Sequence, residues 1–138
     1  NVTGVQQVAG VVGWLENNTT TFAKNCVNYG TVMATSYQIG GIAGFAKGTL
    51  TDCVNFGDVT SSGSGYVGGI GGATKDAKGS RSNCVNYGNI SGTDYVGGCF
   101  GMINKTTTNC YGYGTATAPT ANDGEVVGSG AEYLTYTE

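Results

Sequence analysis

The chain has 138 residues, a formal net charge of −3 and no histidine, and 26 of its residues are glycine, well above the usual ~7 %. Its length suits one domain, and 39 % hydrophobic against 11 % charged residues provides enough apolar surface to exclude disorder. Glycine does not recur at every third position, which excludes collagen. The six basic residues form no stripe, which argues against binding to nucleic acid or to an anionic membrane.

Two short phrases alternate along the chain. The first, at 8–13, is glycine-rich and is called here the glycine block; the second, Cys-Val-Asn-Tyr-Gly at 26–30, is called the cysteine block. The glycine block returns at 39–44, 67–72 and 96–101, and the cysteine block at 53–57, 84–88 and, in altered form, 110–114. Self-similarity with a period of roughly 20 to 50 residues is typical of stacked repeat architectures.

Each block predicts one short strand region. The glycine block sets β-branched residues among glycines, and the cysteine block alternates before it ends in a turn signal. The stretches 14–25 and 73–83 are rich in Asn, Thr, Lys and Ser, and we expect them to be loops that protrude on one side. No stretch shows a helical period of useful length, so little or no helix is expected.

The repeats predict an all-β fold, a right-handed parallel β-solenoid of about four to five coils over residues 1–116. A unit of 26 to 31 residues cannot close its own core, but stacked copies can. Joining like strands by a full turn makes them parallel, and such crossovers are right-handed in ~98 % of cases. Residues 117–138 depart from the repeat, and we expect a degenerate C-terminal coil, cap or tail that protects an open sheet edge.

Four cysteines share the slot that opens the cysteine block: Cys26, Cys53, Cys84 and Cys110. If the coils stack, neighbouring Cβ atoms are ~4.8 Å apart, beyond the ~3.5–4.5 Å that a disulfide prefers, so a column of free thiols is predicted. Cys99 stands where other blocks carry Val11, Ile42 and Ile70, so we expect it to pack as an apolar residue. A linear row of thiolates cannot surround one ion, so no metal site is predicted.

Asparagine and glycine also recur at fixed slots. Asn28, Asn55 and Asn86 predict a ladder of side-chain amides at a turn, in which each amide is satisfied by the coils on either side. Gly41 and Gly69, with Gly98 in the next block, are expected where the coil bends tightly and a Cβ would strike the neighbouring wall.

Aromatic residues are the feature that indicates binding. One slot holds Tyr29, Phe56, Tyr87 and Tyr113; Tyr66 and Tyr95 precede two glycine blocks, with Tyr37 near the equivalent place; and Trp14 with Phe22 in the first long stretch is a rival contact point. Such columns could form a platform for sugar rings or a protein partner. The alternative is structural: the rings stack on one another and stiffen the array, and Trp14 packs as a lid over the N-terminal coil.

Nothing in the sequence predicts catalysis or a cofactor. The lack of histidine removes Ser-His-Asp and Cys-His nucleophilic sites and most zinc sites. Asp52 and Asp58 lie in one repeat, but they flank the cysteine block and are more simply solvated turn residues than a glycosidase pair. Arg81 is the only arginine, whereas a polysaccharide lyase would need several basic groups.

The alternating Gly-Gly-Ile-x-Gly and Asn-Cys-Val-Asn-Tyr-Gly-x-Val phrases resemble the GLUG-type repeats of bacterial secreted and cell-surface proteins, over roughly residues 5 to 116. The resemblance implies a β-helical array found in adhesin-like proteins and in non-catalytic regions of surface proteases, including immunoglobulin A-cleaving ones. The cysteine slot departs from that pattern, where a polar or small residue is usual, and no catalytic residue is carried over.

We therefore expect a non-enzymatic adhesion or spacer module, secreted or displayed on the cell surface as part of a larger exported protein. Its partners would be a glycan or a surface protein of a host or partner cell. The alternatives are a carbohydrate-binding module that uses the tyrosine columns and a filament subunit whose copies join end to end. No apolar run approaches the ~20 residues of a membrane span, so no membrane insertion is expected.

Overall fold

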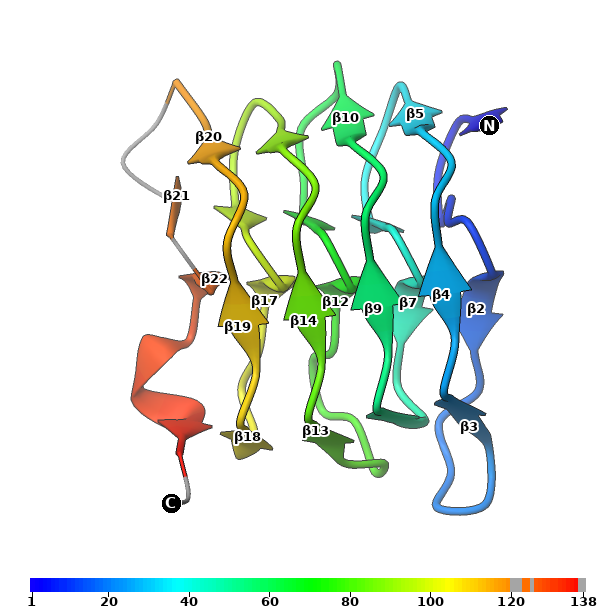
Figure 1. Ribbon diagram of the computed structural model, residues 1–138, viewed down its shortest axis with the longest axis vertical. Coiled ribbons are helices and arrows are strands. Elements are labelled where there is room, and N and C mark those ends of the chain that lie inside the picture. Colours follow the sequence, from blue (N-terminus) through cyan, green and yellow to red (C-terminus); the bar gives the residue numbers. More distant parts are fainter. Residues whose placement is uncertain (120–122, 125, 137–138) are drawn as a thin grey trace.

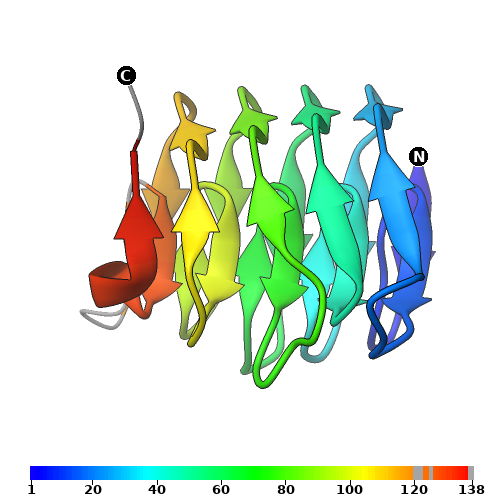
Figure 2. The ribbon, with the colours of Figure 1, turned by 90° about the horizontal axis from the view of Figure 1, so that it is seen from below.

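The protein, described here by a computed structural model for residues 1–119, 123–124 and 126–136, is a β-solenoid of five stacked coils (Figures 1 and 2). All strand pairings of the described residues are parallel and join one coil to the next. In Figure 1 the chain climbs in front through β4, returns behind through β7 and advances from right to left, which is a right-handed sense. The predicted parallel solenoid is confirmed.

Five sheets run along the solenoid axis; each of the three inner coils contributes one strand to every sheet, and the first and last described coils contribute to four sheets each. Sheet A contains β1 (Val2–Gly4), β5 (Val32–Ala34), β10 (Val59–Ser61), β15 (Ile90–Ser91) and β20 (Ala116–Thr117). Sheet B contains β6 (Ile39–Gly40), β11 (Val67–Gly68), β16 (Val96–Gly97) and β21 (Asp123–Gly124). Sheet C contains β2 (Val12–Leu15), β7 (Ala43–Ala46), β12 (Gly71–Ala73), β17 (Phe100–Met102) and β22 (Val127–Ser129).

The cysteine blocks lie on the other side of the coil. Sheet D contains β3 (Phe22–Lys24), β8 (Thr49–Thr51), β13 (Arg81–Ser82), β18 (Thr107–Thr108) and β23 (Leu134–Thr135). Sheet E contains β4 (Val27–Asn28), β9 (Val54–Asn55), β14 (Val85–Asn86) and β19 (Tyr111–Gly112). A short 3₁₀-helix, η1 (Ala131–Tyr133), is the one helical element of the described residues.

The coil has five strands where the sequence predicted two strand regions, because corners divide both regions. The corner between sheets D and E is a single residue with positive φ in four successive coils: Asn25 (56°), Asp52 (54°), Asn83 (55°) and Asn109 (53°). Asn and Asp tolerate this left-handed conformation better than other side chains, so an Asn or Asp precedes every cysteine block. The corner between sheets B and C contains the second glycine of each pair, Gly41, Gly69 or Gly98, and the residue that follows it.

The two stretches predicted as loops are shorter than expected. Trp14 belongs to β2 and Phe22 to β3, which leaves residues 16–21 as the loop; β12 and β13 leave residues 74–80. Strands of two to four residues suffice here because each is paired in register with the neighbouring coil, as Trp14 is with Phe45. Short strands interrupted by corners carry too little periodicity to be recognised within polar stretches.

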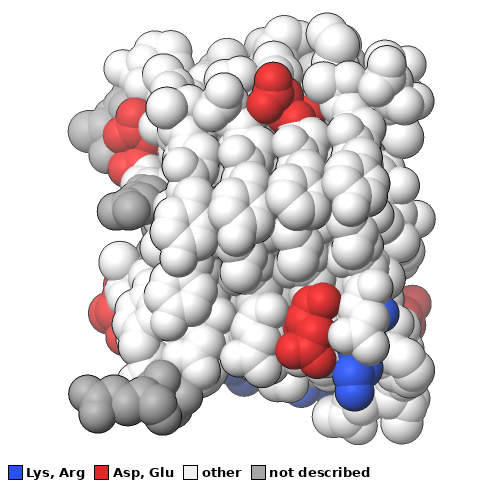
Figure 3. All heavy atoms as spheres, in the orientation of Figure 1, with Lys and Arg blue, Asp and Glu red and all other residues white. Residues whose placement is uncertain are grey.

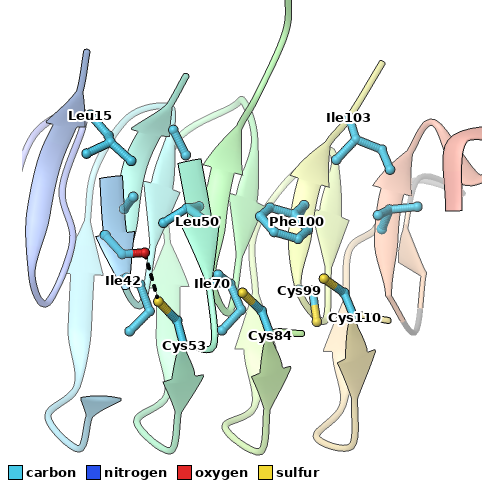
Figure 4. Packing of buried hydrophobic residues seen from close by; sticks show 14 residues of the cluster. Leu15, Ile42, Leu50, Cys53, Ile70, Cys84, Cys99, Phe100, Ile103 and Cys110 are labelled. Atoms are coloured by element: carbon cyan, nitrogen blue, oxygen red, sulfur yellow. Dashed lines mark hydrogen bonds between the residues drawn. The ribbon is translucent and has the colours of Figure 1, made fainter. Parts of the chain in front are cut away.

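Two apolar clusters fill the interior. The larger lies among sheets C, D and E and contains the rows Ile42, Ile70, Cys99 and Cys53, Cys84, Cys110, together with Leu50, Phe100 and Ile103 (Figure 4). The smaller lies between sheets A and B and contains Val32, Ile39, Val59, Val67, Ile90 and Val96. The described residues after Thr117 add β21, β22 and β23 to the same sheets. No helix of the described residues is long and apolar enough to cross a membrane.

Candidate functional site

An asparagine ladder supports sheet E from inside. Asn28 Nδ2 donates to Asn55 Oδ1 and Asn55 Nδ2 donates to Asn86 Oδ1, both at 2.7 Å, and all three amides are buried. Each Nδ2 also donates to the carbonyl two residues on, at Gly30, Gly57 and Gly88 (2.7, 2.7 and 2.8 Å). The ladder therefore ties β4, β9 and β14 together and holds the turn that follows each of them.

Glycine at the corner between sheets B and C makes room for this ladder. A Cβ at Gly41 would lie 2.4 Å from Asn55 Oδ1, and one at Gly69 would lie 2.2 Å from Asn86 Cγ. Side-chain atoms do not approach so closely, so the amides reach across the interior only because these positions lack a side chain. The expected clash with a neighbouring wall is confirmed, and the wall is the asparagine ladder.

All five cysteines are free thiols, and Cys53, Cys84, Cys99 and Cys110 are buried. Cys53 Sγ donates to Ala23 O at 3.4 Å (Figure 4) and Cys99 Sγ to Tyr111 O at 2.9 Å. Hydrogen bonding with Cys110 and Cys53, together with burial, raises the pKa of Cys84, and hydrogen bonding with Cys84 lowers the pKa of Cys53 and of Cys110. Burial, with a smaller contribution from the neighbouring Cys110, raises the pKa of Cys99 well above its ordinary value. These thiols are part of the core.

Arg81 is a buried cation in the slot that Leu50 fills one coil earlier. Its guanidinium donates to Gly79 O at 2.6 Å and Thr106 O at 3.2 Å, and Nε donates to Thr107 Oγ1 at 3.3 Å. Burial lowers its pKa. These bonds tie the 74–80 loop to the following coil, which is a structural role.

Tyr29, Phe56, Tyr87 and Tyr113 form one continuous stack just beyond sheet E, called here the aromatic row. Their centroids are 5.1, 5.2 and 5.4 Å apart and successive rings are inclined by 3°, 7° and 17°. Parallel rings at these separations must be offset, since rings in contact lie only ~3.5 Å apart along their normal. Each ring therefore covers part of its neighbour and leaves part of its own face open.

The exposure of the rings agrees with this offset. The end rings, Tyr29 and Tyr113, are 77 % and 66 % exposed, and the inner rings, Phe56 and Tyr87, keep 45 % and 50 %. A second row runs beside them on the outer face of sheet E, formed in register by Val27, Val54, Val85 and Tyr111. Together the two rows make an exposed apolar surface, called here the sheet E strip.

Charge is absent from the middle of this face. The view of Figure 3 shows a broad uncharged band across the molecule, with acidic side chains above and below it. Asp52 and Asp58, both exposed, lie before and after the sheet E strand of the second coil, and Lys24 is the nearby base in the first. The strip is thus neutral and bordered mainly by acids.

The other predicted contact residues lie apart from this strip. Tyr66 and Tyr95 contact each other at the entry to sheet B, with centroids 5.1 Å apart and planes tilted by 31°. Gln7 and Gln38 occupy this slot in the earlier coils, where Gln7 Nε2 donates to Gln38 Oε1 (3.1 Å). Tyr37 is one residue out of that column, beside Gly65. Trp14 packs edge-on against Phe45 (5.3 Å) on sheet C, away from Phe22 on sheet D.

Sequence reasoning missed the valine row, Tyr111 and Tyr136. Tyr136 lies 5.3 Å from Tyr111, its hydroxyl donates to Cys110 O at 3.3 Å, and the two rings border a hollow of about 370 Å³ with Tyr113, Gly112 and Val126. The sequence did contain a signal for the valine row and Tyr111. Side chains alternate along a strand, so the residue between cysteine and asparagine in each block points outward, on the same face as the aromatic row.

The sheet E strip presents aromatic rings and valine side chains on the outside of the solenoid. No group of His, Cys, Asp or Glu within the described ranges is arranged to hold a metal ion, and Asp52 and Asp58 stand at opposite ends of one strand. Comparison with protein-family models, curated proteins and solved structures gave no match. The sheet E strip is the candidate site because it combines exposure, regular aromatic spacing and lack of charge.

Proposed function

We propose that this chain is a non-enzymatic adhesion or spacer module, a stiff solenoid that presents the sheet E strip to a partner surface. The observation that carries the proposal is the aromatic row, four rings in regular stacking on an uncharged, solvent-facing side. Exposed apolar area of this regularity is uncommon on a protein with no binding partner. The resemblance to GLUG-type repeats supports display on, or secretion from, a bacterial cell as part of a larger exported protein.

Stiffness supports the spacer role. The asparagine ladder, the thiol column and the ring stack each run parallel to the axis, so bending the solenoid would break three sets of contacts at once. Within the described residues every buried side-chain nitrogen and oxygen has a hydrogen-bond partner. A solenoid stiffened by these contacts would hold an attached domain at a fixed distance and orientation.

The test is binding of the purified chain to whole-cell surfaces and to arrays of glycans and surface proteins. Tyr29→Ala and Tyr113→Ala remove the end rings of the aromatic row, which are its most exposed rings, and Met33→Ala removes an exposed apolar side chain (54 %) from sheet A as a control. We expect the tyrosine variants to lose most binding and Met33→Ala to keep it, with unchanged circular dichroism. Equal binding by all three variants, or no binding by the unmodified chain, would contradict the proposal.

A further inference from the structure

We propose that the sheet E strip binds an extended, uncharged, β-1,4-linked glycan that lies along the solenoid axis with about one sugar ring on each coil. This inference rests on the proposed function and names its ligand class. Three independent properties of the strip lead to it: the interval between rings, their chemical character and the charge around them.

The interval between binding elements selects the linkage. The four rings repeat every 5.1 to 5.4 Å in a straight line, because the register of sheet E places one on each coil. In an extended β-1,4-linked chain of pyranoses, successive sugar rings follow one another at nearly this interval, also in a straight line. Chains joined α-1,4 curl and chains joined β-1,3 wind, so both lose register with a straight row after two or three sugars.

The chemistry of the strip suits the C–H faces of sugars. The open part of each offset ring offers a π face to axial C–H groups, and the hydroxyls of Tyr29, Tyr87 and Tyr113 can exchange hydrogen bonds with sugar hydroxyls. The valine row lies two residues away along the strands, about 6.6 Å at ~3.3 Å per residue, so the strip is about as wide as one pyranose ring.

Charge selects against acidic glycans. The charged side chains beside the strip are Asp52 and Asp58, with Lys24 at one end, and the chain carries a net charge of −3. A uronate or sulfated polymer would meet these carboxylates without a row of cations to compensate. A neutral polymer avoids this repulsion, and its hydroxyls can donate hydrogen bonds to the carboxylates.

The experiment is isothermal titration calorimetry of the whole chain with hexasaccharides of β-1,4-, α-1,4- and β-1,3-linked glucose, and with β-1,4 oligomers of two to six sugars. We expect the β-1,4 hexamer to bind at least ten-fold more tightly than the other two. We expect affinity for β-1,4 oligomers to rise several-fold with each sugar up to four, the number of rings in the row, and then to level off.

Two variants locate the site. Tyr113→Ala shortens the aromatic row from four rings to three, so the affinity plateau should move from four sugars to three. Tyr66→Ala removes a ring from the separate column at sheet B and should leave both the plateau and the affinity unchanged. An unmoved plateau in Tyr113→Ala, with its circular dichroism intact, overturns the inference.

The outcomes separate this inference from the proposed function. Equal affinity for the three linkages, or no dependence on length, overturns the inference and leaves the adhesion proposal standing. No binding to any glucan, alongside cell-surface binding that Tyr29→Ala abolishes, also overturns it and identifies the partner as another polymer. Loss of cell-surface binding in every assay removes the proposed function as well.

Discussion

At the scale of single residues, the amide of Asn55 joins its own coil to the coils on both sides with three hydrogen bonds. It donates to Gly57 O and Asn86 Oδ1 and accepts from Asn28 Nδ2. Asn55→Ala leaves these buried partners short of one bond each, and an unsatisfied buried group costs about 1–3 kcal/mol. We expect a loss of about 3 kcal/mol in the free energy of unfolding in urea.

The control for Asn55 is an asparagine whose bonds are open to water. Asn89 is exposed and accepts from the amide and hydroxyl of Thr115. Water can replace that acceptor, so Asn89→Ala should cost less than about 1 kcal/mol. Equal losses in the two variants would show that the ladder contributes no more than a surface contact.

The corner residue Asn83 is predicted to tolerate glycine and to reject a β-branched side chain. Its φ of 55° lies in the left-handed region, which costs most other residues about 1–2 kcal/mol. Asn83→Val should therefore lower the free energy of unfolding by about that amount, because Val adds a branched Cβ to the strained backbone. Asn83→Gly should remain within about 0.5 kcal/mol of the unmodified chain, and a large loss there would mean that the side chain, not the backbone, matters at the corner.

At the scale of elements, the repeat of the blocks was enough to predict the coils, their parallel direction and the columns of equivalent residues. Cys53 and Cys84, or Asn55 and Asn86, occupy equivalent slots only if each coil closes in one period. The five-sheet cross-section was missed because the corners are short: the corner between sheets D and E turns at one residue, such as Asp52, whose positive φ leaves no periodic signal in the sequence. The spacing of the aromatic residues in the sequence does not predict how neighbouring rings are offset, so the stacking geometry of the aromatic row could not be predicted.

The thiol of Cys99 makes the stability of sheet C depend on pH. Burial raises its pKa, so it stays protonated in the folded chain while the unfolded chain ionises near pH 8.5. The stability that the protonated Cys99 thiol contributes to the folded chain is fully present below pH 8.5 and falls as the pH rises. The free energy of unfolding should be lower by about 2 kcal/mol at pH 10. Cys99→Val places an apolar side chain of similar size in the slot of Ile42 and Ile70 and removes this titration.

The measurement compares urea unfolding of the unmodified chain and Cys99→Val from pH 7 to pH 10. The difference in unfolding free energy should be constant up to about pH 8 and then grow in favour of the variant. A difference that stays flat to pH 10 would mean that Cys99 ionises equally in both states, which its complete burial does not allow.

At the scale of the whole molecule, the first coil is less well covered than the coils that follow it. Val11 occupies the inward column of Ile42, Ile70 and Cys99, yet it is 48 % exposed whereas the other three are fully buried. The same holds for Cys26, which is less buried than the three thiols that follow it. Within the described residues, the interior slots of the first coil are thus less covered than those of later coils, and β1 to β4 each pair with a strand on one side.

This end is where a second copy would continue the sheets, which supports the alternative proposal of a filament subunit. We expect the sedimentation coefficient of the purified chain to rise with concentration, because end-to-end stacking buries Val11 and extends the aromatic row beyond Tyr29. Val11→Lys places a charge in that slot without touching the sheet E strip, and should hold the chain monomeric while glycan binding is unchanged. Sedimentation that does not change with concentration would contradict the filament proposal. The chain would then act as a single rod, with adhesion carried by its one strip of four rings.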